Sequence, residues 1–183
     1  KLRITSAGKV GVGTDMGGAP ASSYPFGVYT TGTGYLYTET SGSSASSGLR
    51  AKAGTSDFTI YTTQGIGQLA VYDNTNTEER LRIDSNGRLL LGTSTGRSAG
   101  GVTAQLQVEG TSYNTSSLNL IINSNDSNPG YISLVKTRGT SDGSSTVVQD
   151  GDYLGLIQFC GADGTDINSR AAEITARVDG SPG

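Results

Sequence analysis

Three pairs of carboxylates stand close enough in the sequence to suggest acid–base chemistry. They are Asp150 with Asp152, Asp163 with Asp166, and Glu78 with Glu79. Two carboxyl groups that flank a glycosidic bond can cleave a sugar polymer. The Asp pairs enclose glycine, so ordinary turns explain them more simply, and the Glu pair precedes arginines with which it can form surface ion pairs. The Asp–Gly loops could hold calcium, but neither has the spacing of a known calcium loop. We predict no catalytic residue and no metal ligand.

The chain contains no histidine and a single cysteine, Cys160. This composition excludes Ser–His–Asp and Cys–His nucleophilic sites and most catalytic zinc sites. Cys160 lies in the apolar run 154–160, so we expect a buried structural thiol. The glycine pairs at 11 and 13 and at 32 and 34 lack the third glycine and the helix of a nucleotide site. No cofactor is predicted.

Tyrosines form the remaining candidate binding surface, because the side chain has an apolar face for stacking on a sugar and a polar tip. The candidates for sugar stacking are Tyr24, Tyr29, Tyr35 and Tyr37, and Tyr61 and Tyr72 could contribute in the same way. The alternative is that these rings pack between strands or between chains. We favour packing, because the chain is poor in other large apolar side chains.

The composition is difficult to reconcile with one self-contained core. The 183 residues include 28 Gly, and only 33% are hydrophobic. A domain of this length normally buries about two-thirds of its unfolded surface. Disorder is not favoured, because nine Tyr and three Phe recur in short alternating runs and the net charge is only −3. We therefore expect the apolar faces to be buried against copies of the same chain.

Two classes of partner are not expected. The chain is mildly acidic and has no basic patch, which argues against nucleic acid. No stretch approaches the roughly 18 consecutive apolar residues of a transmembrane helix, so membrane insertion is not predicted.

An internal repeat is the most informative feature. Residues 2–14 match residues 81–93 at an offset of 79, with the shared pattern Leu-Arg-Ile-x-Ser-x-Gly-basic-apolar-x-apolar-Gly-Thr. A weaker similarity follows at nearly the same offset, because residues 26–28 and residues 106–108 are both apolar-x-apolar triplets. Repeats at a fixed period are typical of stacked arrays of similar units.

The repeated pattern predicts a β-hairpin. Alternate apolar residues place their side chains on one face of a strand, and residues 84–87 (Asp-Ser-Asn-Gly) have the chemistry of a turn. Gly13 and Gly92 would end the hairpin where another backbone comes close or the chain bends. An isolated two-stranded hairpin is only marginally stable, and three-fold association would supply another layer. The predicted trimer-core residues are Leu2, Ile4, Val10, Val12, Leu81, Ile83, Leu89 and Leu91.

Other short alternating runs predict further strands. They lie at residues 35–37, 58–61, 68–72, 118–122, 131–135, 154–159 and 168–177, the last of which could also be a helix. We expect residues 1–97 to hold the first repeat unit and the hairpin that opens the second. Residues 98–183 would form the body of the second unit, which ends before its closing hairpin.

The repeated segment resembles a known family. Residues 79–93 (ERLRIDSNGRLLLGT) look like the repeated hairpin of tail-fibre and related virion fibre proteins of marine bacteriophages, cyanophages among them. Residues 104–110, 153–159 and 171–179 are similar to other recurring segments of those proteins. The resemblance implies a homotrimer, a location in the virion and a role in host attachment. Its partners would be other virion proteins and a host surface glycan or protein receptor.

The sequence thus predicts an all-β, elongated repeat fibre of short strands and hairpins, in prism-like or sandwich-like modules completed by homotrimerisation. We expect a structural protein and not an enzyme. Two alternatives stay open. One is a carbohydrate-binding or carbohydrate-cleaving tailspike, and the other is a bacterial extracellular filament or adhesin built from similar modules.

Overall fold

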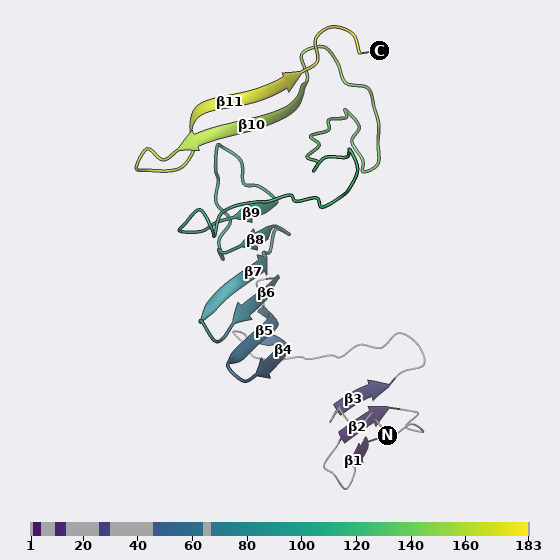
Figure 1. The fold of residues 1–183 in the computed structure, drawn as a ribbon, viewed down its shortest axis with the longest axis vertical. Coiled ribbons are helices and arrows are strands. Elements are labelled where there is room, and N and C mark those ends of the chain that lie inside the picture. Colours follow the sequence, from purple (N-terminus) through teal and green to yellow (C-terminus); the bar gives the residue numbers. More distant parts are fainter. Residues whose placement is uncertain (1, 5–9, 14–25, 30–45, 64–66, 183) are drawn as a thin grey trace.

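The computed structural model describes residues 2–4, 10–13, 26–29, 46–63 and 67–182, and for the first three ranges only the strand pairing is considered. The described part is all-β, which confirms the predicted class. Its strands form three sheets, of three, six and two strands (Figure 1). In these ranges there is no helix of the length and apolar character needed to cross a membrane.

The six-stranded sheet contains its strands in chain order. The strands are β4 (Ser46–Ala53), β5 (Ser56–Thr63), β6 (Gln68–Asp73), β7 (Glu78–Ile83), β8 (Leu89–Leu91) and β9 (Leu106–Val108). The pairs from β4 to β8 are antiparallel, and β8 and β9 are parallel. Successive strands therefore stack side by side as the chain proceeds (Figure 1).

The N-terminal sheet has the same pairing as the end of the six-stranded sheet. It consists of β1 (Leu2–Ile4), β2 (Val10–Gly13) and β3 (Phe26–Tyr29). Leu2 pairs with Val12 as Leu81 pairs with Leu91. β2 and β3 are parallel, as are β8 and β9. Both copies of the repeated pattern therefore form the predicted hairpin, and in both a parallel third strand follows.

The turn of the second hairpin has the predicted chemistry. The Asp84 carboxylate accepts hydrogen bonds from the backbone N–H groups of Asn86 and Arg88, at 2.9 and 3.0 Å. Gly87 has a φ of 76°, in the left-handed region that glycine adopts without steric cost. The Arg88 side chain forms an ion pair with Asp84 at 2.6 Å. The turn thus fixes the register in which the apolar residues of β7 and β8 meet.

Gly92 ends this hairpin where another backbone approaches, as predicted. Its φ is 74°, and a Cβ atom at this position would collide with the carbonyl oxygen of Glu109. The Glu109 N–H donates to the Leu91 carbonyl at 3.0 Å, which extends the β8–β9 pairing. A glycine at position 92 therefore allows the chain to return in parallel beside β8.

The third sheet is a long hairpin of β10 (Tyr153–Gly161) and β11 (Ser169–Arg177). β11 confirms the predicted strand at 168–177 and excludes the helical alternative. Cys160 is exposed in β10. The expectation of a buried thiol was wrong, because the parts of the described chain that approach this hairpin leave the Cys160 side chain open to solvent.

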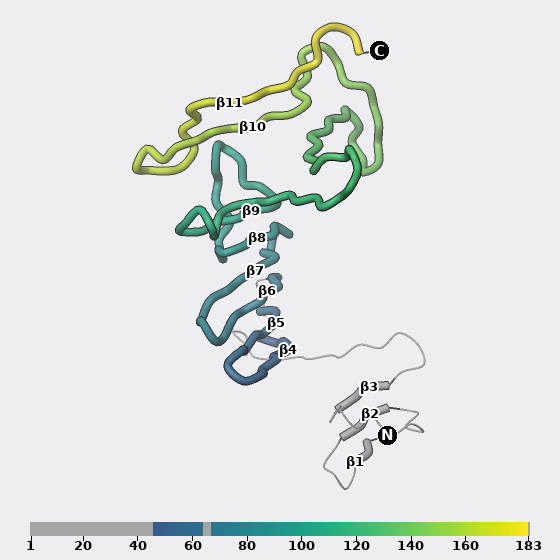
Figure 2. The backbone as a smooth tube through the Cα atoms, in the orientation of Figure 1, coloured from purple at the N-terminus to yellow at the C-terminus, as the bar shows by residue number. Residues whose placement is uncertain are grey.

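Two strand predictions did not match the structure, and one strand was missed. Residues 118–122 and 131–135 are not strands, because they form no hydrogen-bonded ladder within the described chain (Figure 2). Conversely, β4 was not predicted, since its sequence SSGLRAKA has only one large apolar residue. The strand predicted at 35–37 lies outside the described residues.

The described chain has almost no core of its own. Ala70 and Leu90 are the only buried apolar residues in the described ranges. The accessible surface is 13873 Å² for a chain of 18.7 kDa. A compact monomer of this mass exposes about 8,300 Å². The chain thus exposes about 5,600 Å² more than a compact monomer of its mass would.

Candidate functional site

One face of the six-stranded sheet carries an unbroken row of apolar residues. Register pairing places them opposite one another from β4 to β9: Leu49, Ile60, Val71, Leu81, Leu91 and Val108. A second row on the same face joins Leu69, Ile83, Leu89 and Leu106. We call these ten residues the apolar face. Leu49 is 51% exposed and Ile60 is 50% exposed, so the apolar face is open to solvent in the single chain.

The opposite face of the sheet is polar and internally bonded. Arg50 donates from Nε to Asp57 at 2.7 Å, and Asn74 donates to the Thr59 hydroxyl at 2.8 Å. The buried Asp57 carboxylate has a lowered pKa, chiefly because Arg50 hydrogen-bonds to it. A network of this kind satisfies polar groups without needing another layer. In the described part of the chain, the polar groups of one face of the sheet therefore bond to one another, while the apolar face is left uncovered.

A second network continues along the polar face. Arg82 donates from Nε to Glu79 at 2.6 Å and from Nη1 to the Gln68 side chain. Leu90, the register partner of Arg82, is buried on this face. The β8–β9 connection covers it, since Gln107, next in the same row, bonds to Arg97 and Thr95 of that connection. The described chain thus covers part of the polar face but not the apolar face.

The predicted core residues of the second hairpin all lie on the apolar face. Leu81 pairs with Leu91 and Ile83 with Leu89, so all four side chains share one face. In the first hairpin Leu2 pairs with Val12 and Ile4 with Val10, the same register one repeat earlier. The side chains of these last four residues lie outside the described part. Sequence reasoning missed Leu49, Ile60 and Val71, although the alternation at 58–60 was a signal for them.

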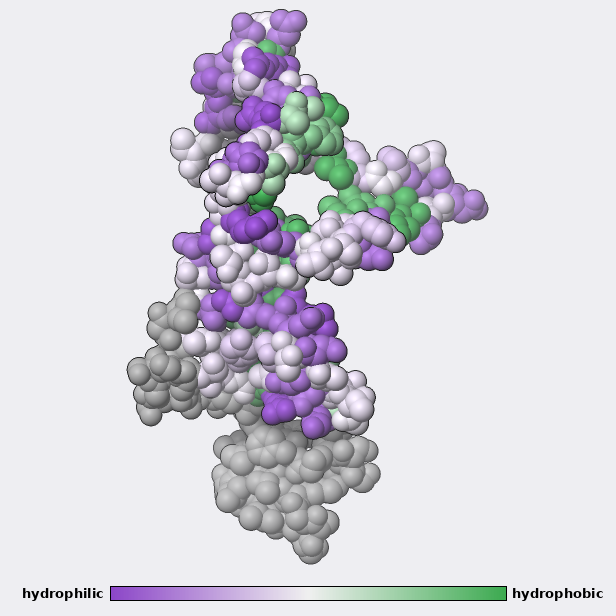
Figure 3. All heavy atoms as spheres, turned by 90° about the vertical axis from the view of Figure 1, so that its left-hand side faces the viewer, coloured by the Kyte–Doolittle hydropathy of each residue, from purple (hydrophilic) through white to green (hydrophobic). Residues whose placement is uncertain are grey.

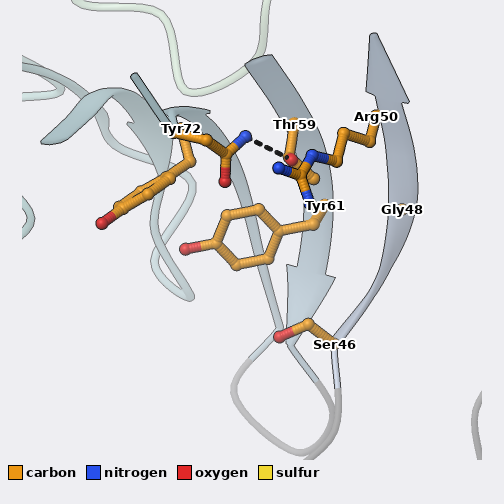
Figure 4. Close-up of a pocket in the computed structure, with 7 residues that line it drawn as sticks. Ser46, Gly48, Arg50, Thr59, Tyr61 and Tyr72 are labelled. Carbon is orange, nitrogen blue, oxygen red and sulfur yellow. Dashed lines mark hydrogen bonds between the residues drawn. The ribbon is translucent and has the colours of Figure 1, made fainter. Parts of the chain in front are cut away.

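The polar face also contains a shallow hollow of about 420 Å³. Its lining consists of Ser46, Gly48, Arg50, Thr59, Tyr61, Tyr72 and Asn74. Figure 4 shows the rings of Tyr61 and Tyr72 projecting from neighbouring strands on one side of the sheet. Gly48 allows β4 to lie close to β5 at the hollow, because a Cβ there would collide with the Ile60 carbonyl oxygen and lie 2.7 Å from the Tyr61 Cβ. Burial, followed by the nearby Glu79 charge, raises the pKa of Tyr61, so its phenol stays protonated.

The tyrosines predicted for sugar stacking cannot be placed in a site. Tyr24, Tyr35 and Tyr37 lie outside the described residues, and for Tyr29 only the backbone pairing of β3 is described. The two tyrosines that the structure does bring together are Tyr61 and Tyr72. They stand 11 positions apart in the sequence, and their proximity follows from the β5–β6 register.

The carboxylate pairs have structural partners. Asp152 accepts two hydrogen bonds from Arg138, at 2.7 and 2.8 Å, and one from the Gln149 N–H, and the Arg138 bonds hold its pKa well below the ordinary value. Asp150 accepts from the Gly180 N–H at 2.8 Å. The two aspartates thus tie the base of the β10–β11 hairpin to the preceding loop and to the C-terminal residues. This use agrees with their interpretation as turn and loop residues.

The other two carboxylate pairs also have structural partners. Asp163 accepts from the backbone N–H groups of Thr165 and Asp166, which lower its pKa, in the turn between β10 and β11. Glu78 pairs with Arg80 and Glu79 with Arg82, as the sequence suggested. Within the described ranges, no group of three or more His, Cys, Asp or Glu side chains is arranged to hold a metal ion.

Comparison with known proteins gave no further assignment. No model of a protein family matches this chain, and neither a search of curated proteins nor a search of solved structures found a match.

Proposed function

We propose that this chain is a structural segment of a virion fibre, a tail fibre or a similar appendage, that assembles as a homotrimer and contributes to host attachment. The observation that carries the self-assembly is the apolar face, which runs across all six strands and is left open. The viral setting and the number of copies rest on the resemblance of residues 79–93 to phage fibre hairpins.

Energetics support association between copies. Burying apolar surface stabilises by roughly 25 cal/mol per Å², and obligate subunit interfaces bury about 2,000–5,000 Å². In the described ranges the large apolar side chains that such an interface would bury are exposed, among them Leu49, Ile60 and Leu106 of the six-stranded sheet. A large exposed apolar face in a soluble chain marks an interaction site or leads to aggregation.

The mechanism would be mechanical. The strands stack in chain order, so added strands extend the sheet, and three apolar faces turned toward a common axis would leave the polar faces outside. On that arrangement the bonded networks of Arg50 with Asp57 and of Arg82 with Glu79 form the outer surface.

The test is the mass of the recombinant chain by light scattering. We expect a species of about three times 18.7 kDa with a strong β signal in circular dichroism. A stable, well-folded monomer would contradict self-assembly, and a stable dimer or tetramer would contradict the three-fold arrangement.

A carbohydrate-binding spike is the second candidate function, and the hollow with Tyr61 and Tyr72 favours it. The hollow combines aromatic faces with hydroxyl, amide and guanidinium groups, the chemistry that recognises sugar rings and their hydroxyls. Replacing both tyrosines with Ala should abolish retention on host polysaccharide, while Tyr113→Ala, at a residue 83% exposed outside the hollow, should not. A reducing-end assay on the same mixtures would show whether any bound polymer is also cleaved.

A further inference from the structure

Two apolar segments outside the sheets have the sequence of strands but no strand partner among the described residues. They are residues 118–122 (LNLII) and 131–135 (YISLV), and we call them the unpaired segments. Their apolar side chains are strongly exposed, with Ile121 at 77% and Val135 at 85%. Figure 3 shows an open gap edged by apolar residues in the upper half of the molecule, the half that holds β10, β11 and residues 111–152 in Figure 1.

The backbone of the unpaired segments is not hydrogen-bonded within the described chain. No backbone–backbone hydrogen bond involves residues 117–136, and the one backbone N–H bond in this stretch is from Asn128 to the Asp126 side chain. The segments do lie close to other parts of the described chain. A Cβ on Gly130 would lie 3.4 Å from the Leu120 carbonyl oxygen, and a Cβ on Gly155 of β10 would lie 2.9 Å from the Leu134 Cβ.

The exposed apolar side chains and the unbonded backbone of the segments together restrict what can cover them. Covering the apolar side chains removes water from the backbone between them, and a buried N–H or C=O without a partner is costly. An extended chain satisfies its backbone groups by joining a β-ladder. The segments therefore need a strand edge and not only an apolar surface.

The β10–β11 hairpin offers such edges. It is a two-stranded sheet, so each strand has one unpaired edge within the described chain. Its own apolar residues are also exposed, among them Ile157, Phe159 and Ile174. A two-stranded ribbon is marginally stable in water and gains stability from a third strand.

We propose that residues 118–122 and 131–135 pair as β-strands with the β10–β11 hairpin of a neighbouring copy of this chain. The occupant is a second copy because, within one described chain, the unpaired segments form no backbone hydrogen bond with the free edges of β10 and β11, while every copy carries both. In a closed ring every segment then finds an edge, and none is left over. This inference rests on the proposed self-assembly and names the strands that exchange between subunits.

Amide hydrogen exchange on the full chain tests this pairing. In the assembled protein we expect amides of the unpaired segments to exchange at least about 100-fold more slowly than in an unstructured peptide. An assembled protein whose amides at 118–122 and 131–135 exchange at unprotected rates would overturn the pairing while leaving the proposed function intact. A monomer by light scattering would overturn both.

A pair of proline variants gives an independent test. Ile132→Pro removes an N–H from the second unpaired segment and should raise the protein concentration needed for assembly at least about tenfold. Asp142→Pro is the matched control, because it precedes Gly143 (φ 76°) in a turn closed by the Ser144 N–H, where proline is compatible. Assembly of the Ile132→Pro variant at wild-type concentrations would overturn the pairing of that segment.

Discussion

Leu81 lies directly opposite Leu91 in the β7–β8 pair, at the middle of a row of apolar residues that crosses the six-stranded sheet. The same register joins Leu2 to Val12 one repeat earlier. Cross-strand apolar pairs stabilise a sheet when another layer covers them, and the described chain supplies no such layer over the apolar face. Substitution within this Leu pair is therefore the most direct test of self-assembly.

A charge at the centre of the apolar face should prevent assembly. In a Leu81→Asp variant a carboxylate would be buried without a partner, which costs several kcal/mol per subunit. We expect light scattering to show monomer or irregular aggregate in place of a defined oligomer. Ser85→Asp adds the same charge at an exposed turn of the same hairpin and should assemble like the wild type. A defined Leu81→Asp oligomer of wild-type mass would show that the apolar face is not the interface.

Gly92 should tolerate substitution less well than Gly87, although both have positive φ. Alanine at either position costs about 1–2 kcal/mol for the left-handed backbone. At Gly87 no atom lies within 4 Å of the added Cβ, whereas at Gly92 the Glu109 carbonyl blocks it. We expect Gly92→Ala to be less stable than Gly87→Ala by a further ~1–3 kcal/mol in chemical denaturation. Equal losses would mean that β9 does not approach β8 as closely as described.

Asp73 should make stability depend on acid pH. Hydrogen bonds from Asn76 and then Arg80 lower its pKa from 3.8 to about 2. Because the folded state binds this proton less readily than the unfolded state, the stabilisation is complete above the ordinary pKa. It is lost as the pH falls from about 4 toward about 2. Thermal unfolding at fixed protein concentration between pH 6 and pH 2 measures the effect.

An Asp73→Asn variant is the control for this pH dependence. It keeps one acceptor oxygen but removes the charge that pairs with Arg80. We expect it to unfold at lower temperature than the wild type at pH 6 and to lose less stability between pH 4 and pH 2. If its pH profile has the same slope as the wild type, the acid sensitivity arises from other carboxylates.

Gly155 should reveal whether the second unpaired segment rests against β10. The Cβ of a Gly155→Ala variant would crowd Leu134, whereas in Gly161→Ala, at the other end of the strand, nothing lies within 4 Å. We expect Gly161→Ala to be neutral or slightly stabilising, since alanine restricts the unfolded chain. Gly155→Ala should destabilise by about 1–3 kcal/mol. Equal denaturation midpoints for the two variants would contradict the Leu134 contact.

The sequence alone was sufficient to predict the structure where short-range chemistry determines it. The turn at Asp84 and Gly87, the close approach at Gly92 and the shared face of Leu81 and Leu89 all follow from short-range patterns. The equivalence of the two hairpins follows from the repeated pattern itself.

Features that depend on distant partners could not be predicted in this way. β4 is a strand because β5 pairs with it, although its own residues are mostly small or polar. The ion pair of Arg50 with Asp57 and the hollow between Tyr61 and Tyr72 both require the register of neighbouring strands. Residues 118–122 have the alternation of a strand but pair with no strand edge within the described chain, so pattern alone gave the wrong structure there.

Because the strands of the six-stranded sheet are neighbours in chain order, the length of the sheet along the stacking direction is set by the number of strands. Neighbouring strands lie about 4.8 Å apart, so each additional hairpin advances the sheet by about 10 Å. Residues inserted into a turn widen the sheet locally without advancing it. The length of the sheet would then depend on the number of hairpins that the gene encodes. Duplication of a hairpin would lengthen the sheet in discrete steps that electron microscopy could measure.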